Sequence, residues 1–385
     1  MFSDRTNWNL RTNRLTEALA AHRAAGKPLL DLSASNPTQC GFEYDGAAVL
    51  RALSSPFALK YEPEPLGLPS ARQAVAAYYA TRNIDVPVSD LVLTTSTSEA
   101  YSFIFRTLCN PGDEILVPQP GYPLFDFLAE IQDVKLVRYA LVYDHGWQIN
   151  FHSLEQAITP RTRAVVVVHP NNPTGHFATE TEAAELNGIL SRCDIAVIAD
   201  EVFLDFALAG YAPPSFAAND ATLTFTLSGI SKICGLPQMK VAWLRASGPQ
   251  RLKSEALARL EIIADTHLSM NAPIQFALPT LLDQRHTFQK QVNTRLTQNL
   301  SRIDERLASH KTCSRLKLEG GWYAVLRVPA TASDEDLVIR LLTERDVLVH
   351  PGHFYEFDSD GFLVISLITA PGEFAEGIDR ILSSI

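Results

Sequence analysis

Residues 164–175 read AVVVVHPNNPTG, an apolar, mostly β-branched run that ends in a turn held by two prolines. Consecutive apolar residues without alternation are typical of a strand that helices cover on both faces. Four more such runs occur between Ser89 and Trp243: LVLTT (91–95), EILVPQP (114–120), IAVIAD (195–200) and LTFTLSG (223–229). Because helix-like stretches separate these runs, we predict an α/β fold with a mostly parallel sheet.

The rest of the chain predicts a second, smaller domain. With 385 residues, the chain exceeds the roughly 250–300 residues at which one hydrophobic core stops growing. Apolar residues recur at helical spacing over residues 272–310, which predicts one long helix leading out of the sheet domain. Apolar runs at 320–329, 346–352 and 361–369 then alternate with helical segments, as in an α+β domain. We expect a large domain over residues 45–271 and a small domain formed by residues 1–44 and 272–385.

The composition argues against several classes of protein. The formal net charge is −10 with both signs scattered along the chain, so we expect no nucleic-acid partner. Five cysteines form no CxxC pair and are too sparse for a disulfide-stapled domain, which favours free thiols in a reducing cytoplasm. Residues 1–14, MFSDRTNWNLRTNR, lead into no apolar run, so we expect neither a signal peptide nor a membrane anchor. We predict a soluble cytoplasmic protein without a metal site.

Polar side chains follow the first two strands. Ser96, Thr97 and Ser98 run straight into a helix, whose free backbone N–H groups and positive dipole end favour a phosphate group. An ordinary helix N-cap explains the same residues. Tyr122 lies on the turn PQPGY after the second strand, where its ring is placed either to stack on a planar ligand or to pack against its neighbours.

Further polar groups follow the later strands. Asn171 and Asn172 end the AVVVV strand, and an amide there is placed to donate to a ligand oxygen. Asp200 ends the next strand, where a carboxylate is costly unless a cation faces it; a helix N-cap or an ordinary salt bridge is the alternative. Lys232 follows the last strand and Lys240 lies eight positions later. A lysine is usually a solvated surface charge, but desolvation and a neighbouring cation favour the nucleophilic free amine.

Taken in order, these motifs resemble the class I/II aminotransferases, which are pyridoxal 5′-phosphate (PLP) enzymes of fold type I. The resemblance covers nearly the whole chain. It is carried by LSASNPT (32–38), KYEPEPLGLPSARQAV (60–75), TSTSEAY (95–101), NPGDEILVPQPGYPLF (110–125), HPNNPTG (169–175), ADEVF (199–203) and SGISK (228–232). It implies a large domain with a mostly parallel sheet of the seven-stranded type, a smaller α+β domain, and PLP as the cofactor.

The resemblance also assigns roles around the ring of the cofactor. Lys232 would form the Schiff base with PLP and later carry the proton between the substrate and the cofactor. Asp200 would pair with the pyridine nitrogen and keep it protonated, so that the ring withdraws electrons from the substrate Cα. Asn172 would donate to the 3′-oxygen of the ring, and Tyr122 would stack on its face.

At the phosphate of PLP the family pattern is only partly kept. The resemblance implies that the backbone groups of Ser96 and Thr97 hold the phosphate. Lys240 replaces the arginine that family members use there, which keeps the charge and loses the bidentate geometry. Tyr61 would reach the phosphate of the neighbouring subunit. An obligate homodimer follows from that role.

Three further positions depart from the family. Phe203 replaces the usual tyrosine three residues after the aspartate, so one hydrogen bond to the 3′-oxygen should be missing. Gly229 replaces a common serine, as in some alanine-aminotransferase-like members. Val364, in GFLVISLIT (361–369), takes the place of the arginine that clamps the substrate α-carboxylate. Either another group such as Arg327 replaces it, or the substrate is not an ordinary α-amino acid, or the ungapped alignment is shifted. The segment ADTHLSMNAP (264–273) also has no arginine, so the sequence does not support specificity for aspartate or glutamate.

The leading hypothesis is an aminotransferase that moves an amino group from an amino acid or amine to a keto acid or other carbonyl acceptor. The alternative is another PLP reaction on the same fold, such as that of a lyase, decarboxylase or synthase, because the fold does not decide which Cα bond breaks. A non-catalytic PLP-binding protein is the third hypothesis. The presence of Lys232, Asp200 and Asn172 together, and the lack of room for an N-terminal DNA-binding module, weigh against it.

Overall fold

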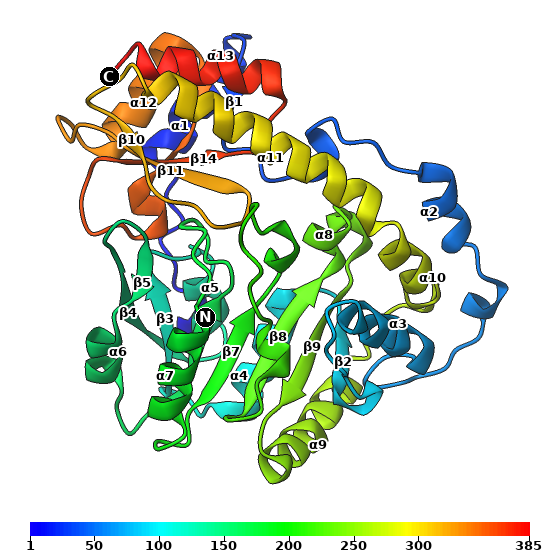
Figure 1. The fold of residues 1–385 in the computed structure, drawn as a ribbon. Helices are drawn as coiled ribbons and strands as arrows, with labels where there is room; N and C mark the ends of the chain where they lie inside the picture. The colour runs from blue at the N-terminus through cyan, green and yellow to red at the C-terminus, as the bar shows by residue number, and fades with distance from the viewer.

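An eight-stranded sheet forms the centre of the larger body in the computed structural model, which describes residues 1–385 (Figure 1). In spatial order the strands are β2 (Leu91–Thr94), β9 (Ala242–Ser247), β8 (Thr224–Gly229), β7 (Ala196–Asp200), β6 (Thr162–Val168), β3 (Glu114–Gln119), β4 (Lys135–Tyr143) and β5 (Trp147–Ile149). Only β9 and β5 run antiparallel to their neighbours. The predicted mostly parallel α/β sheet is confirmed, with the short strand β5 added at one edge.

Helices cover both faces of this sheet. They include α3 (Pro69–Ala80), α4 (Thr97–Leu108), α5 (Phe125–Glu130), α6 (Phe151–Ala157), α7 (Glu180–Leu190) and α9 (Gln250–His267), and α8 (Ile230–Ile233) directly follows β8. The helix α2 (Gly46–Ala52) instead packs on residues 272–283, at the right of Figure 1. Alternate residues of β6 enter different cores: Val166 packs with α4, α5 and α9, whereas Val165 packs with α6 and α7. Burial on both faces explains why the strands are continuously apolar.

The long helix predicted over residues 272–310 is wrong in one respect, because the structure divides it into α10 (Ala272–Asp283) and α11 (Arg285–Leu307). Arg285 is buried and donates from Nη1 to the Leu282 carbonyl at 2.6 Å. In a continuous helix that carbonyl would accept from the backbone N–H four residues later. The division thus lies where a buried side chain contacts the last turn of α10.

The two halves of this helical stretch pack on different bodies. Leu278 and Leu281 of α10 share a core with α3 and with β2 and β9 of the large sheet. In contrast, α11 packs against the C-terminal helix α13 (Pro371–Leu382). This packing favours a domain boundary at Gln284 rather than at residue 272, and we propose that division.

The smaller body, at the top of Figure 1, combines residues 14–31 with the C-terminal part of the chain, whereas the N-terminus itself lies beside α5, where Trp8 donates to Glu130. Strands β10 (Ser314–Arg315), β11 (Tyr323–Arg327), β14 (Phe362–Ser366) and β13 (His350–Pro351) form an antiparallel sheet, and β1 (Leu30–Asp31) pairs in parallel with β12 (Val347–Leu348). Helices α1 (Arg14–Ala24), α12 (Asp334–Arg345) and α13 complete it. No helix in the structure is both long enough and apolar enough to cross a membrane.

The bodies meet closely at Gly175, in the turn after β6. Its backbone has a φ of +71°, and its carbonyl accepts from the N–H groups of Glu319 and Gly320 in the small body, at 3.3 and 3.1 Å. A Cβ at Gly175 would lie 2.0 Å from Leu318 Cδ1 and 2.6 Å from the Gly320 carbonyl. Only glycine permits this approach of the two backbones, which brings β11 over the ends of the parallel strands.

Candidate active site

A cavity of about 190 Å³ lies at the carboxyl ends of β6, β7 and β8, beneath β11. It brings together six of the predicted residues: Ser96, Thr97, Tyr122, Asn172, Asp200 and Lys232. The other lining residues are Ser35, Phe125, Val168, Val202, Phe203, Gly229, Ser231, Ala242 and Tyr323. Parallel strands that end side by side account for much of this assembly, as in other open α/β sheets.

Lys232 lies in the short helix α8 directly after β8, and its amine is surrounded by aromatic rings. Nζ is 5.0 Å from the ring centroid of Trp322 and 5.5 Å from that of Phe203. Burial lowers the pKa of Lys232 to about 8, although the negative charge of Asp200 partly opposes that shift. A sizeable fraction of the side chain is therefore the free, nucleophilic amine near neutral pH.

Asp200 ends β7 as a buried carboxylate. Its Oδ2 accepts from the Tyr101 hydroxyl at 3.1 Å, and its Oδ1 accepts from the Val202 N–H at 3.2 Å. Burial raises the pKa of Asp200 to about 6, despite these two hydrogen bonds and the positive charge of Lys232. Because Asp200 is buried and forms no salt bridge, a cationic group of a ligand in the cavity would stabilise its charged form.

The two asparagines of the NNP turn have different tasks. Asn171 donates through Nδ2 to the Pro120 carbonyl at 3.1 Å and to the Thr174 hydroxyl at 3.0 Å, so its amide holds the turn together. Asn172 lines the cavity, is 8% exposed, and its Oδ1 has no hydrogen-bond partner. Asn171 Oδ1 also lacks a partner, but only Asn172 lines the cavity, so Asn172 is the asparagine that is placed to meet a ligand.

Two predictions were made for Ser96, a helix N-cap and a phosphate site. The Ser96 side chain accepts from the Glu99 N–H at 3.2 Å and therefore caps α4. Ser96 and Thr97 nevertheless line the cavity, where the free N–H groups of the first helical turn are directed. Tyr122 lines the opposite wall, is 38% exposed, and meets Phe125 edge to face with ring centroids 5.8 Å apart.

Three predicted residues lie away from the cavity. Lys240 is exposed and follows a short 3-10 helix with a φ of 54°, so burial rather than this second cation accounts for the lowered pKa of Lys232. Tyr61 is 79% exposed and borders a separate hollow of about 270 Å³ that contains neither Lys232 nor Asp200. Arg327 is exposed, with its guanidinium over the rings of Tyr143 and Phe362.

Gly229 and Phe203, which depart from the family pattern, both line the cavity. A Cβ at Gly229 would lie 2.8 Å from the Val241 carbonyl and 2.9 Å from Ala242 Cα, so the neighbouring strand β9 leaves room only for glycine. Phe203 is buried in the cavity wall and packs edge to face on Trp322, with ring centroids 5.2 Å apart. Its phenyl ring brings no hydroxyl into the site.

The prediction from sequence did not include several lining groups. Tyr323 and Ser35 come from the two ends of the chain and enter the cavity from the small body. Tyr101 was missed as the partner of Asp200, although it lies one helical turn beyond Thr97 and thus on the same face of α4. The close Gly320–Gly321 pair before Tyr323 was the available signal for a tight approach of the backbone.

Comparison with known proteins shows the family of the chain. The family model described as "Aminotransferase class I and II" matches residues 27–381, and the chain belongs to that family. Glutamate-pyruvate aminotransferase AlaA of Escherichia coli (strain K12) is 28% identical over 353 residues, covering 89% of this chain and 87% of the relative. AlaA of Haemophilus influenzae is 26% identical over 351 residues, with the same coverage. The protein is therefore an enzyme that transfers amino groups with PLP as its cofactor.

Solved structures agree in fold over the full length. An aminotransferase from Escherichia coli superimposes with a TM-score of 0.88 at 26% identity, covering 100% of this chain and 97% of the other. Alanine aminotransferase from Pyrococcus furiosus gives the same TM-score at 23% identity, covering 100% and 99%, and supports the fold alone. The prediction of PLP fold type I is confirmed.

The residues of the cavity fit PLP on their own chemistry. Lys232 offers an amine, Asp200 a buried carboxylate without a salt bridge, and Asn172 a side-chain amide whose Nδ2 can donate to a ring oxygen. Tyr122 and Val202 add apolar surface to the cavity lining, against which a planar ring could pack. Bound there, PLP supplies the electron sink on which amino-group transfer depends.

Proposed function

We propose that this cavity moves an amino group from a primary amine donor to a carbonyl acceptor, with Lys232 as the covalent anchor of PLP and the carrier of the proton. The observation that supports these roles best is the position of Lys232 Nζ, which is sheltered by Trp322 and Phe203 and has a pKa of about 8. An amine with this pKa attacks a carbonyl, and it exchanges protons readily near neutral pH.

The other polar residues would bind and orient the cofactor. Asp200 would hold a proton on the ring nitrogen, with Tyr101 and the Val202 N–H fixing the carboxylate. Asn172 would meet the 3′-oxygen. Because Lys240 lies outside the cavity lining, the phosphate would depend chiefly on Ser96, Thr97 and Ser231 with the helix N-terminus of α4.

We also propose a cytoplasmic homodimer in which Tyr61 reaches the site of the partner subunit. Support for the dimer comes from the exposed apolar side chains near Tyr61, which include Phe57 at 69% and Leu59 at 93% exposure. Support for the cytoplasm comes from five free cysteines, three of which are buried.

The experiment that tests the proposed reaction is a half-reaction followed by absorption spectroscopy. Purified holoenzyme receives amine or amino-acid donors one at a time, without an acceptor. We expect the absorption band of bound PLP to give way to that of pyridoxamine phosphate, with return of the first band when a carbonyl acceptor is added. A lyase or decarboxylase would release its product while the cofactor stays in the PLP form, and that result would contradict the proposal.

A further inference from the structure

Charge is scarce in the wall of the cavity. Among its 15 lining residues, only Asp200 and Lys232 carry charge, and both lie at the places where the cofactor is anchored. The side that faces the small body is formed by Ser35, Tyr122 and Tyr323, which are neutral. On this side, a substrate bound near Lys232 therefore meets hydroxyl groups and aromatic rings of its own subunit, and no fixed cation from that subunit.

Two arginines outside the cavity, Arg138 and Arg295, are bound to other groups of the protein. Arg138 donates to both carboxylate oxygens of Asp126 and to those of Glu356, at 2.6–3.0 Å. Arg295 donates to the carbonyls of Cys40 and Ile368 at 3.1 and 2.9 Å. Neither residue lines the cavity. If Arg138 moved to a substrate, the carboxylates of Asp126 and Glu356 would lose their shared partner. Arg138 is therefore poorly suited to bind a substrate carboxylate.

The sheet of the small body is apolar around Val364, the position at which family members carry an arginine. In the antiparallel sheet, Val364 is opposite Val325 on one side and His350 on the other, and these residues share a face with Tyr323. Val364 is fully buried and Val325 is 3% exposed. Neither Val364 nor Val325 lines the cavity, so this part of the sheet brings no cation to it.

His350 does not fill the place of a cation. It is half-buried, and its Nδ1 lies 3.0 Å from the Tyr355 hydroxyl. Burial lowers the pKa of His350 below its ordinary value, with Asp31 as the charged group that partly opposes the shift. The imidazole is therefore neutral at physiological pH and offers hydrogen bonds without charge.

We propose that the amino donor of this enzyme is a primary amine whose amino-bearing carbon carries no carboxylate. This inference rests on the proposed function and specifies its substrate class. In the exchange, the donor carbon loses its C–N bond and one C–H bond and gains a C=O bond. The acceptor carbon undergoes the reverse change, so the reaction needs no outside oxidant.

The first test compares matched donors in the half-reaction of the wild-type holoenzyme. The pairs are 2-phenylethylamine and phenylalanine, 3-methylbutylamine and leucine, and ethylamine and alanine. We expect each amine to form pyridoxamine phosphate faster than its amino acid, by about tenfold or more in the second-order rate constant, because an unpaired carboxylate is costly to bury. An amino acid that reacts as fast as its amine in any pair overturns the proposal.

A gain-of-charge variant provides the second test. Ser35 is exposed and lines the cavity, so Ser35→Arg brings in a guanidinium without burying it in a core. We expect this variant to shift the rate ratio toward the amino acid in every pair, while the neutral, similarly long Ser35→Gln keeps the wild-type preference. An unchanged ratio in Ser35→Arg contradicts the idea that a missing cation sets the preference.

Binding of unreactive ligands separates this inference from the proposed reaction. Calorimetric titration of the holoenzyme with 3-phenylpropanoate and with neutral 3-phenylpropanamide should give weaker binding of the carboxylate in the wild type, and a gain for the carboxylate alone in Ser35→Arg. Absence of any pyridoxamine phosphate would contradict the proposed function while leaving this comparison intact. The inference is overturned if the wild type binds the carboxylate as tightly as the amide or more tightly. Loss of that binding in Arg295→Gln would then show that Arg295 binds the carboxylate.

Discussion

The amine of Lys232 shows how its surroundings fix its chemistry. Attraction between a cation and an aromatic ring amounts to roughly 0.5–2 kcal/mol, less than the cost of removing an ammonium group from water. The rings of Trp322 and Phe203 therefore shelter the side chain without keeping it charged, and the pKa falls to about 8. Water exclusion, rather than a second cation, prepares this lysine for covalent chemistry.

Substitution of Lys232 should abolish covalent attachment of PLP. We expect Lys232→Ala and Lys232→Arg to show no cofactor adduct by intact-protein mass spectrometry after borohydride reduction, whereas the wild type carries one. Amino-group transfer should fall by at least about a thousandfold, which corresponds to about 4 kcal/mol of lost transition-state stabilisation. An adduct in Lys232→Ala at wild-type level would place the anchor at another residue.

Phe203 should make the linkage between Lys232 and PLP more basic than a tyrosine would. A hydroxyl donated to the 3′-oxygen would stabilise the deprotonated form of that linkage, and a phenyl ring at 5.5 Å from Nζ gives no such bond. We expect the absorption of bound PLP to titrate at a higher pH in the wild type than in Phe203→Tyr. Phe203→Leu, which also lacks a hydroxyl, should stay near the wild type, and identical titrations in all three proteins would contradict the prediction.

The sequence predicted the residues that directly follow buried strands. Asn172, Asp200 and Lys232 each end an apolar run, and parallel strands bring such ends together without further information. Tyr323 and Ser35 escaped prediction because they enter from another sheet, and their position depends on how the two bodies dock. The spacing of apolar residues within one segment does not show which distant segment it will contact.

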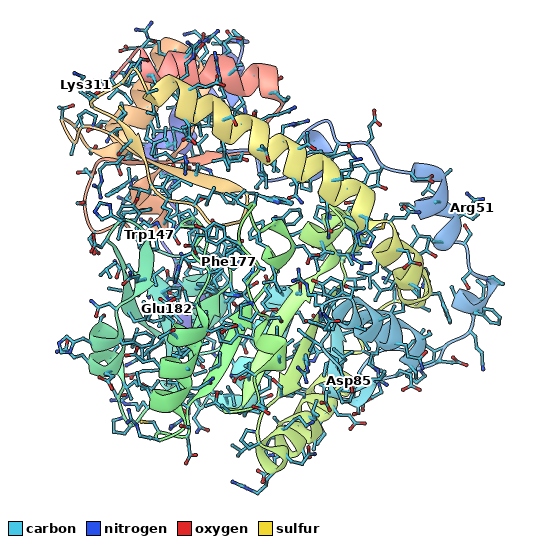
Figure 2. The ribbon with its side chains drawn as sticks, in the orientation of Figure 1. Arg51, Asp85, Trp147, Phe177, Glu182 and Lys311 are labelled. Carbon is cyan, nitrogen blue, oxygen red and sulfur yellow. The ribbon has the colours of Figure 1, made fainter.

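At the level of elements, a buried histidine links the turn after β6 to both bodies. His176 Nε2 lies 3.2 Å from Glu182 Oε1 in α7, and its Nδ1 lies 3.5 Å from Glu319 Oε2 beside β11. Glu319 also accepts from the Phe177 N–H at 3.0 Å. Figure 2 labels Phe177 and Glu182, which lie at the boundary between the two bodies. The two carboxylates raise the pKa of His176 to about 9, although burial acts against them.

This arrangement predicts a stability contribution that depends on pH. Because the folded pKa of about 9 exceeds the ordinary value near 6.5, the contribution is complete below pH 6.5 and is lost as the pH rises through 9. His176→Gln should lower the free energy of unfolding by roughly 1–3 kcal/mol at pH 6 and by clearly less at pH 9.5. Urea unfolding of both proteins at the two values measures this, and a difference that grows with pH would contradict the prediction.

A break such as that at Gln284 also belongs to the level of elements and shows a limit of periodicity. Both α10 and α11 keep helical spacing, so their apolar residues predict one continuous helix. Where the two helices divide, the buried side chain of Arg285 donates to the Leu282 carbonyl. Such a contact depends on where a side chain is buried, which the spacing of apolar residues does not record.

For the whole molecule, the exposed apolar side chains of Leu50, Phe57, Leu59 and Tyr61 suggest a surface that a second copy covers. They belong to α2 and to the segment before α3, at the right of Figure 1, on the outside of the larger body. If both subunits complete each active site, as we propose, then two different inactive variants should complement each other in a mixed dimer.

Two inactive variants should restore activity when combined. Lys232→Ala lacks the anchor but keeps Tyr61, and Tyr61→Ala keeps the anchor. In a mixed dimer, one site would contain an intact Lys232 and a partner's intact Tyr61, so refolding the two variants together should recover up to about a quarter of wild-type activity for random pairing. Recovery no greater than the sum of the separate variants would contradict the shared site. Sedimentation of Leu59→Asp, expected to dissociate, checks the interface independently.

The parallel pairing of Leu30 with Val347 and of Asp31 with Leu348 has a consequence for synthesis on the ribosome. The partner of the first strand emerges about 300 residues after it, a delay of roughly 15–60 seconds at ordinary elongation rates. During that interval, the eight strands between β2 and β9 are complete and able to fold, while the N-terminal segment has nothing to pair with. The newborn chain can therefore fold its middle first, and the segment that contains Leu30 and Asp31 is among the last to be paired.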